Sequence, residues 1–112
     1  MTRELIVSTR PAGAAVVVSV SGEVDILSAP ALSTALSEAL TTGSEVVVVD
    51  LSEVGFFGSA GLSVLVEALA AISGQQLRIV ASTQVRRPIE LTGLDAMLSV
   101  YGTLPEALTD GG

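Results

Sequence analysis

The sequence contains no cysteine and no histidine. Without cysteine, the chain can form no disulfide bond and offers no thiolate for catalysis or zinc binding. Without histidine, it lacks the usual general base near neutral pH and the commonest metal ligand in proteins. Much enzyme chemistry is therefore excluded. Because no spaced set of acidic ligands is present either, we predict no metal site.

Basic residues are also scarce. Five arginines and no lysine stand against 12 acidic residues, which gives a net charge of −7. A surface of this sign repels phosphate backbones, so we expect no nucleic acid partner. No apolar run reaches the roughly 18 residues of a membrane span, and the start, MTRELIVSTR, lacks a signal-peptide core. We therefore expect a cytoplasmic protein without a membrane partner, and a length of 112 residues suits one domain.

Valine-rich segments open the chain. Residues 5–10 and 14–21 flank the turn sequence PAG, which predicts a β-hairpin whose second strand ends at Gly22. Leucine and alanine then recur at helical spacing between Ser28 and Gly43. This spacing predicts an amphipathic helix with Ser28 at its N-cap and Gly43 at its C-terminal end.

An unbroken apolar run at residues 45–51, EVVVVDL, is typical of a central strand that is covered on both faces. The segment that follows has the periodicity of an amphipathic helix and ends at Gly74. We expect this helix to pack on the sheet. Its predicted apolar face consists of Leu62, Leu65, Val66, Leu69 and Ile72.

The last third of the chain continues the alternation of strands and helices. Residues 77–82 predict another buried strand, and a short helix that Pro88 restricts follows it. A short strand at 98–101 precedes Thr103 and Glu106, whose spacing fits the capping box of a final helix. The predicted order is therefore ββαβαβαβα. This is an α/β fold with one mixed sheet, packed helices and right-handed crossovers between parallel strands.

Ser59 lies between glycines where an apolar strand gives way to a helix. A serine-hydrolase elbow, G-x-S-x-G, would need glycine in place of Phe57 and a histidine base, and the chain has neither. A Walker-type phosphate loop would need a lysine, which is also missing. From patterning alone, Ser59 is a helix N-cap worth about 1 kcal/mol. Glu23 and Asp25 are solvated loop carboxylates on the same basis.

Three segments occur in a characteristic order and spacing: GEVDILSAPAL, VVVVDLSEVGFFGSAGLSVLVEA and RRPIELTGLDAML. Through them the chain resembles the STAS family of bacterial anti-sigma factor antagonists over nearly its whole length. The second segment is the most specific, because it combines the family's strand, its DLS end, an aromatic-containing loop and a serine-glycine-leucine helix start. The resemblance implies a single STAS domain at 1–112 with a small mixed β-sheet and packed α-helices. Because chain ends are often poorly ordered, we also expect a mobile tail at 109–112.

The resemblance also implies a function. Members of the family are not enzymes; they bind an anti-sigma factor that is also a serine kinase, and so release a sigma factor for transcription in stress responses. The kinase switches the antagonist off by phosphorylating the serine at the helix start, here Ser59, and a serine phosphatase restores it. No cofactor is implied. By analogy, the partner-binding residues are Glu23, Asp25, Ser28, Phe57, Gly58, Ser59, Ala60 and Gly61.

Position 58 departs from the family pattern. Many members carry aspartate directly before the phosphorylated serine, whereas this chain has Gly58. Glycine removes a charge from the contact surface, and it is expected to widen the backbone freedom beside Ser59 because it takes positive φ easily. The departure keeps an alternative open, namely a constitutive STAS scaffold or a transporter-associated binding subunit without a phosphorylation cycle.

Overall fold

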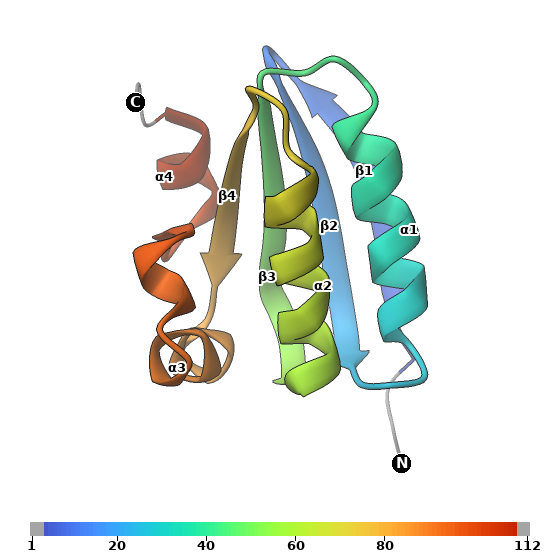
Figure 1. Cartoon of the computed structure of the whole chain (residues 1–112), viewed down its shortest axis with the longest axis vertical. Coiled ribbons are helices and arrows are strands. Elements are labelled where there is room, and N and C mark those ends of the chain that lie inside the picture. Colours follow the sequence, from blue (N-terminus) through green and yellow to red (C-terminus); the bar gives the residue numbers. More distant parts are fainter. Residues whose placement is uncertain (1–3, 110–112) are drawn as a thin grey trace.

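The computed structural model describes residues 4–109, which fold around a five-stranded mixed sheet (Figure 1). The elements are β1 (Ile6–Ala12), β2 (Ala15–Val24), α1 (Ala29–Leu40), β3 (Val46–Phe57), α2 (Ser59–Ala71), β4 (Gln76–Ala81), α3 (Thr83–Leu91), the 3₁₀ turn η1 (Leu94–Ala96), β5 (Ser99–Tyr101) and α4 (Leu104–Thr109). The strands lie in the order β1-β2-β3-β4-β5, with β1 antiparallel to β2 and the other neighbours parallel. The predicted order ββαβαβαβα and the central place of β3 are confirmed.

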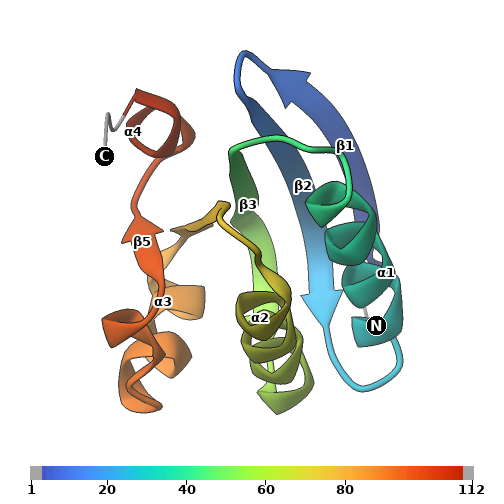
Figure 2. The ribbon, with the colours of Figure 1, turned by 45° about the horizontal axis from the view of Figure 1, so that its top comes forward.

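The valine run of β3 is buried on both faces of the sheet. Val47 and Val49 belong to the larger apolar core, which α1, α2 and α3 cover. Val48 points to the opposite face because side chains alternate along a strand, and there it packs with Ala107 of α4. Figure 1 shows α1 and α2 side by side on the same face of the sheet, and Figure 2 shows α4 directly after β5. One strand thus contributes to two apolar clusters.

Strands β2 and β3 run further than the sequence predicts. The prediction that Gly22 ends its strand is wrong, because β2 continues to Val24, and the predicted aromatic-containing loop is instead the end of β3 at Phe57. The pairing of the two strands shifts register twice near Gly22. Gly22 has φ +104°, and a side chain there would collide with the backbone carbonyl of Glu4, so this irregularity requires glycine. As a result, β2 and β3 end level with each other.

The hairpin turn is tighter than the predicted PAG turn. Ala12 pairs with Ala15, which leaves Gly13 and Ala14 as a two-residue turn, with Gly13 at φ +63°. Pro11 therefore lies within β1, which tolerates proline because it is an edge strand. Proline at a sheet edge also discourages pairing with another chain.

Helix α2 packs on the sheet through a row that combines two small residues, Gly61 and Ala68, with two aliphatic ones. Val66, which the periodicity placed on the apolar face, is 45% exposed, so that part of the prediction is wrong. Small residues allow a helix to approach a sheet closely, and this row sets how α2 lies on β2 and β3. The buried residues of the helix are Gly61, Val64, Leu65 and Ala68.

Polar contacts hold the last helix in place. The Glu106 amide donates to Thr103 Oγ1 at 3.4 Å, which is one bond of the predicted capping box. The return bond from the Thr103 amide to Glu106 is absent among the described residues, and the Thr103 hydroxyl instead donates to Glu106 Oε1 at 2.9 Å. Arg78 on β4 is 4% exposed and donates to the Ala107 carbonyl at 2.6 Å. The same guanidinium also donates to the side chain of Gln76. A buried arginine therefore ties α4 to the sheet.

The helices near the C-terminus are short. Helix α3 continues through Pro88 to Leu91, so the proline lies inside the helix. Helix α4 ends at Thr109, the first residue of the predicted mobile tail, and residues 110–112 lie outside the described residues. No helix in the described part of the chain is long and apolar enough to cross a membrane.

Candidate functional site

The level ends of β2 and β3 bring together two loops that are far apart in the sequence. Val24 pairs with Phe57, and the amide of Gly58 donates to the carbonyl of Val24 at 3.1 Å. The loop that leaves β2 carries Asp25, and the turn that leaves β3 leads into Ser59. All the residues that the sequence predicts for partner binding therefore lie at this one end of the sheet.

Ser59 is the first residue of α2 and not its N-cap, so the predicted capping role is wrong. The carbonyl of Gly58 accepts the first helical hydrogen bonds, from the amides of Gly61 at 3.0 Å and Leu62 at 3.2 Å. Gly58 takes the N-cap position because its own amide donates to the Val24 carbonyl. This hydrogen bond fixes where the helix begins. The hydroxyl of Ser59 is exposed and makes no hydrogen bond within residues 4–109.

The backbone of Gly58 is extended. It has φ −88° and ψ −172°, values that any residue can adopt. The expectation that glycine supplies a positive φ beside Ser59 is therefore wrong. What distinguishes Gly58 is the space that its missing side chain leaves free.

Asp25 organises the loop between β2 and α1. Its Oδ1 accepts hydrogen bonds from the amides of Leu27 at 2.9 Å and Ser28 at 3.0 Å, and from the Ser28 hydroxyl at 3.1 Å. Ser28 occupies the N-cap position of α1, but its side chain makes no capping bond. Its hydroxyl oxygen instead accepts from the Asp25 amide at 2.9 Å, and its single hydrogen is shared between Asp25 Oδ1 and the Glu23 carbonyl, which lies at 2.8 Å. The serine thus closes the loop and does not cap the helix.

Asp25 is expected to make this loop sensitive to acid. The hydrogen bond from the Ser28 amide, with those from the Ser28 hydroxyl and the Leu27 amide, lowers the pKa of Asp25 below its ordinary value of 3.8. Because the folded pKa is the lower one, the stabilisation is present above the unfolded pKa and is lost as the pH falls through the folded pKa. In an NMR titration from about pH 6 to about pH 2, we expect the Leu27 and Ser28 amide resonances to report this titration.

The Asp25→Asn variant is the control for the acid titration. It keeps the shape of the side chain but has no carboxyl proton to gain, so the pH-dependent shifts of the two amides should disappear. Equal shifts in the native chain and in Asp25→Asn would show that another group causes them.

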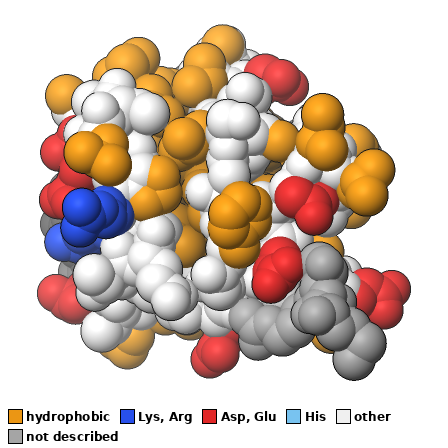
Figure 3. Space-filling view, turned by 90° about the horizontal axis from the view of Figure 1, so that it is seen from below, with side chains coloured by type: hydrophobic (Ala, Val, Ile, Leu, Met, Phe, Trp, Pro, Cys, Tyr) orange, Lys and Arg blue, Asp and Glu red, His pale blue; other side chains and the backbone are white. Residues whose placement is uncertain are grey.

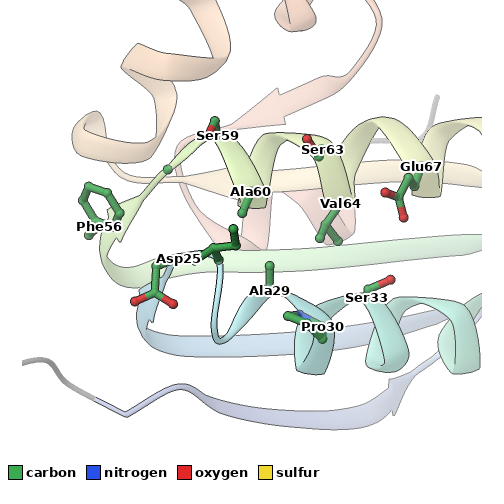
Figure 4. A pocket seen from close by; sticks show the side chains of 12 residues that line it. Asp25, Ala29, Pro30, Ser33, Phe56, Ser59, Ala60, Ser63, Val64 and Glu67 are labelled. Atoms are coloured by element: carbon green, nitrogen blue, oxygen red, sulfur yellow. The ribbon is translucent and has the colours of Figure 1, made fainter.

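A groove of about 720 Å³ opens between α1 and α2 beside this loop. Figure 4 shows Ala60, Val64 and Glu67 pointing from α2 toward α1, whereas Ser59 and Ser63 point to the other side of the helix. Ser59 therefore lies on the rim of the groove, and it also borders a second hollow of about 530 Å³ between α2 and η1. The rest of the groove is lined mainly by Asp25, Ile26, Ala29, Pro30, Ser33 and Phe56.

Large apolar side chains are exposed at this end of the molecule. Ile26 is 80% exposed, Leu27 88% and Phe56 52%. Figure 3, seen from below Figure 1, shows hydrophobic side chains across this surface with acidic groups among them. Phe57, predicted to face a partner, is only 5% exposed and packs beneath the surface next to Gly61. The sequence prediction missed Phe56, which lies on the surface.

The side chains of the site are suited to binding a protein, and one of them, Ser59, can be covalently modified. No three acidic side chains of the described residues lie together as metal ligands. The carboxylates that line the groove are Asp25 and Glu67. Apolar side chains and two carboxylates suit protein binding, and the free hydroxyl of Ser59 is a suitable acceptor for a phosphoryl group.

Comparison with known proteins agrees with these features. The chain matches the family model described as Mlab, STAS domain, over residues 7–100. It is 42% identical over 96 residues to the anti-sigma-F factor antagonist RsfB of Mycobacterium tuberculosis, which covers 83% of this chain and 78% of that protein. It is 32% identical over 84 residues to the anti-sigma-B factor antagonist of Listeria monocytogenes, which covers 72% of this chain and 74% of that protein.

A solved structure shows the same fold. The crystal structure of an anti-sigma factor antagonist from Mycobacterium paratuberculosis has a TM-score of 0.86 at 37% identity, and the match covers 95% of this chain and 92% of that one. The motifs, the element order and the relatives all agree. The chain therefore belongs to the STAS-domain family of anti-sigma factor antagonists.

Proposed function

We propose that this chain is a cytoplasmic anti-sigma factor antagonist, which binds an anti-sigma factor with serine kinase activity and thereby frees a sigma factor for transcription. The names of the relatives support this role. The observation that carries the switch is the position of Ser59, an exposed hydroxyl at the start of α2 on the rim of an open groove. In this position Ser59 can enter a kinase active site without unfolding of the domain. The protein itself acts by binding.

The start of α2 can carry a phosphate. The amides of Ser59 and Ala60 donate no backbone hydrogen bond in the part of the chain that the structure describes. These free amides and the positive end of the helix dipole stabilise an anion. Phosphorylation adds about −1.5 to −2 charges and three acceptor oxygens at this place. We therefore expect the folded domain to tolerate phosphorylation.

The same phosphate opposes partner binding. In the complex, Ser59 approaches the nucleotide of the kinase closely enough for its hydroxyl to attack the γ-phosphate. After the transfer, phosphoserine faces the phosphates of that nucleotide at short range, and like charges in a desolvated interface repel strongly. Phosphorylation thus ejects the partner by local electrostatics, with no change of fold.

Two other proteins complete the cycle. The kinase transfers the γ-phosphoryl group of ATP to Ser59 Oγ, which releases ADP and the hydroxyl proton. A serine phosphatase then uses water to cleave the phosphate ester, which restores the serine and releases inorganic phosphate. The antagonist needs no cofactor of its own for either step.

Phosphate mapping tests the switch. The purified chain is mixed with each candidate anti-sigma kinase of its source organism and ATP, and the modified residue is identified by mass spectrometry. We expect one phosphate, on Ser59, which the Ser59→Ala variant loses. Ser63→Ala is the matched control, because Ser63 is also exposed and points to the same side of α2 (Figure 4).

Two other results would change the proposal. A factor that binds the chain but leaves Ser59 unmodified would favour a constitutive scaffold without a phosphorylation cycle. Failure of every anti-sigma factor to bind would overturn the antagonist role itself.

A further inference from the structure

The ring of Phe56 occupies space that Gly58 leaves free. A Cβ atom at position 58 would lie 3.0 Å from Cε2 and 3.2 Å from Cζ of Phe56. Both distances are shorter than the optimum of about 3.5–4.0 Å between carbon atoms. Any residue other than glycine at this position must therefore displace the ring, although the backbone there accepts every residue.

Phe56 provides the aromatic surface of the groove between α1 and α2. It is 52% exposed and lines the groove together with Ile26. Figure 4 places its ring at the end of the groove where the turn to Ser59 begins. Aromatic side chains that are partly exposed in the free protein contribute much of the binding energy in many interfaces. They bury a large area on binding, and they lose little conformational entropy because they have few rotatable bonds.

The charge of the groove restricts what can bind there. Asp25 and Glu67 line it, and no arginine among residues 4–109 does. Oδ1 of Asp25 accepts the bonds that close the loop, while Oδ2 accepts none within the described residues and remains available to a partner. The whole chain carries a net charge of −7. A complementary segment presents an apolar side chain next to a lysine or an arginine.

We propose that Phe56 is the anchor residue for the anti-sigma partner, and that Gly58 positions its ring. The occupant of the groove is a segment of that partner with an apolar side chain that packs on Phe56 and Ile26, flanked by a basic side chain that pairs with Asp25 or Glu67. This inference rests on the proposed function. The proposal also gives Gly58, the residue before Ser59, a physical role, because a side chain at position 58 would displace the ring of Phe56.

Fluorine NMR can observe the anchor directly, because the chain has two phenylalanines. After labelling with 4-fluorophenylalanine, one resonance reports the exposed Phe56 and the other the buried Phe57, and Phe56→Leu assigns them. We expect Gly58→Ala to shift the Phe56 resonance in the free protein and to leave that of Phe57 in place. Saturation with the anti-sigma partner is expected to shift the Phe56 resonance as well. Absence of either shift would overturn the proposal.

The same label tests a competing occupant. If the groove instead bound a second copy of this chain, the Phe56 resonance of the free protein would move when the protein is diluted. A dilution shift would assign the groove to self-association and overturn the proposal, whereas a constant resonance supports a different protein as occupant.

Affinity measurements separate the anchor from the proposed function. Each purified anti-sigma factor of the source organism is titrated by calorimetry. For a factor that binds the native chain, Phe56→Ala is expected to raise Kd by at least about tenfold and Gly58→Ala by about threefold. Leu91→Ala is the control, because Leu91 is 77% exposed on α3 and outside the groove, and it should leave Kd unchanged.

The outcomes can be told apart. Native binding with an unchanged Kd in Phe56→Ala would refute the anchor and leave the antagonist role standing. No binding of the native chain to any factor would refute both.

Discussion

The Ser59→Asp variant is expected to bind its anti-sigma partner about a hundredfold more weakly than the native chain. This corresponds to a loss of about 2.7 kcal/mol in binding free energy. Aspartate places one negative charge where phosphoserine places about two, so phosphorylation itself should weaken binding further, about a thousandfold. The charge acts where Ser59 must approach the nucleotide of the partner. Calorimetric titration of the native, phosphorylated and substituted chains measures the difference.

Ser59→Ala is the matched control, because it removes the hydroxyl without adding charge. We expect it to retain partner affinity and to keep the free energy of unfolding within about 0.5 kcal/mol. The structure gives the reason, since Gly58 is the N-cap and the Ser59 hydroxyl makes no hydrogen bond within the described residues. Loss of a true N-cap would cost about 0.5–2 kcal/mol, which thermal unfolding followed by circular dichroism would detect. Equal affinity of the Asp and Ala variants would place Ser59 outside the interface.

The order of the elements could be predicted because local patterns and tertiary packing agree. The four valines that open β3 are apolar on both sides of the strand, and such a run of β-branched residues is typical of a strand with two covered faces. Thr103 and Glu106 identify the start of α4 within one helical turn. Each of these signals depends only on residues that are near in sequence. The element it marks can therefore be predicted without knowing how the rest of the chain packs.

The ends of the strands could not be predicted, because they depend on a neighbour that is distant in sequence. Glycine after a valine-rich segment is typical of a turn, so the local sequence predicts that the strand ends at Gly22. In the structure β3 runs beside β2 past this point, and its backbone pairing outweighs the local preference. The level ends of the two strands, which create the site, follow from this pairing.

Two details of the site depend on the same tertiary contacts. A serine and a glycine are both acceptable N-caps, and the bond between the Gly58 amide and the Val24 carbonyl decides between them. Strict alternation from the buried Val54 would turn Phe56 inward. The register shift, which leaves Gly55 unpaired, turns Phe57 inward instead and exposes its neighbour.

The Gly61→Val variant is expected to destabilise the domain by about 3 kcal/mol, the upper end of the usual range for overpacking. A Cβ at this position would lie 2.8 Å from Cε1 of Phe57 and 2.9 Å from Cγ1 of Val24, and valine adds two methyl groups beyond it. Phe57 is 5% exposed and Val24 0%, so neither side chain can move without disturbing the core. The gain in helix propensity on replacing glycine is less than about 1 kcal/mol and does not offset this cost.

Gly102→Ala is the control for Gly61→Val, because among the described residues an added Cβ there meets only Glu106 Oε1, at 3.6 Å. Thermal unfolding should show a Tm about 10 °C lower for Gly61→Val and nearly unchanged for Gly102→Ala. An unchanged Tm in Gly61→Val would contradict the close packing of α2 on β2 and β3. The same packing keeps Ser59 beside the Asp25 loop, so Gly61→Val should also weaken partner binding where it is still folded. It thus lowers stability and affinity together, whereas Ser59→Asp lowers affinity alone.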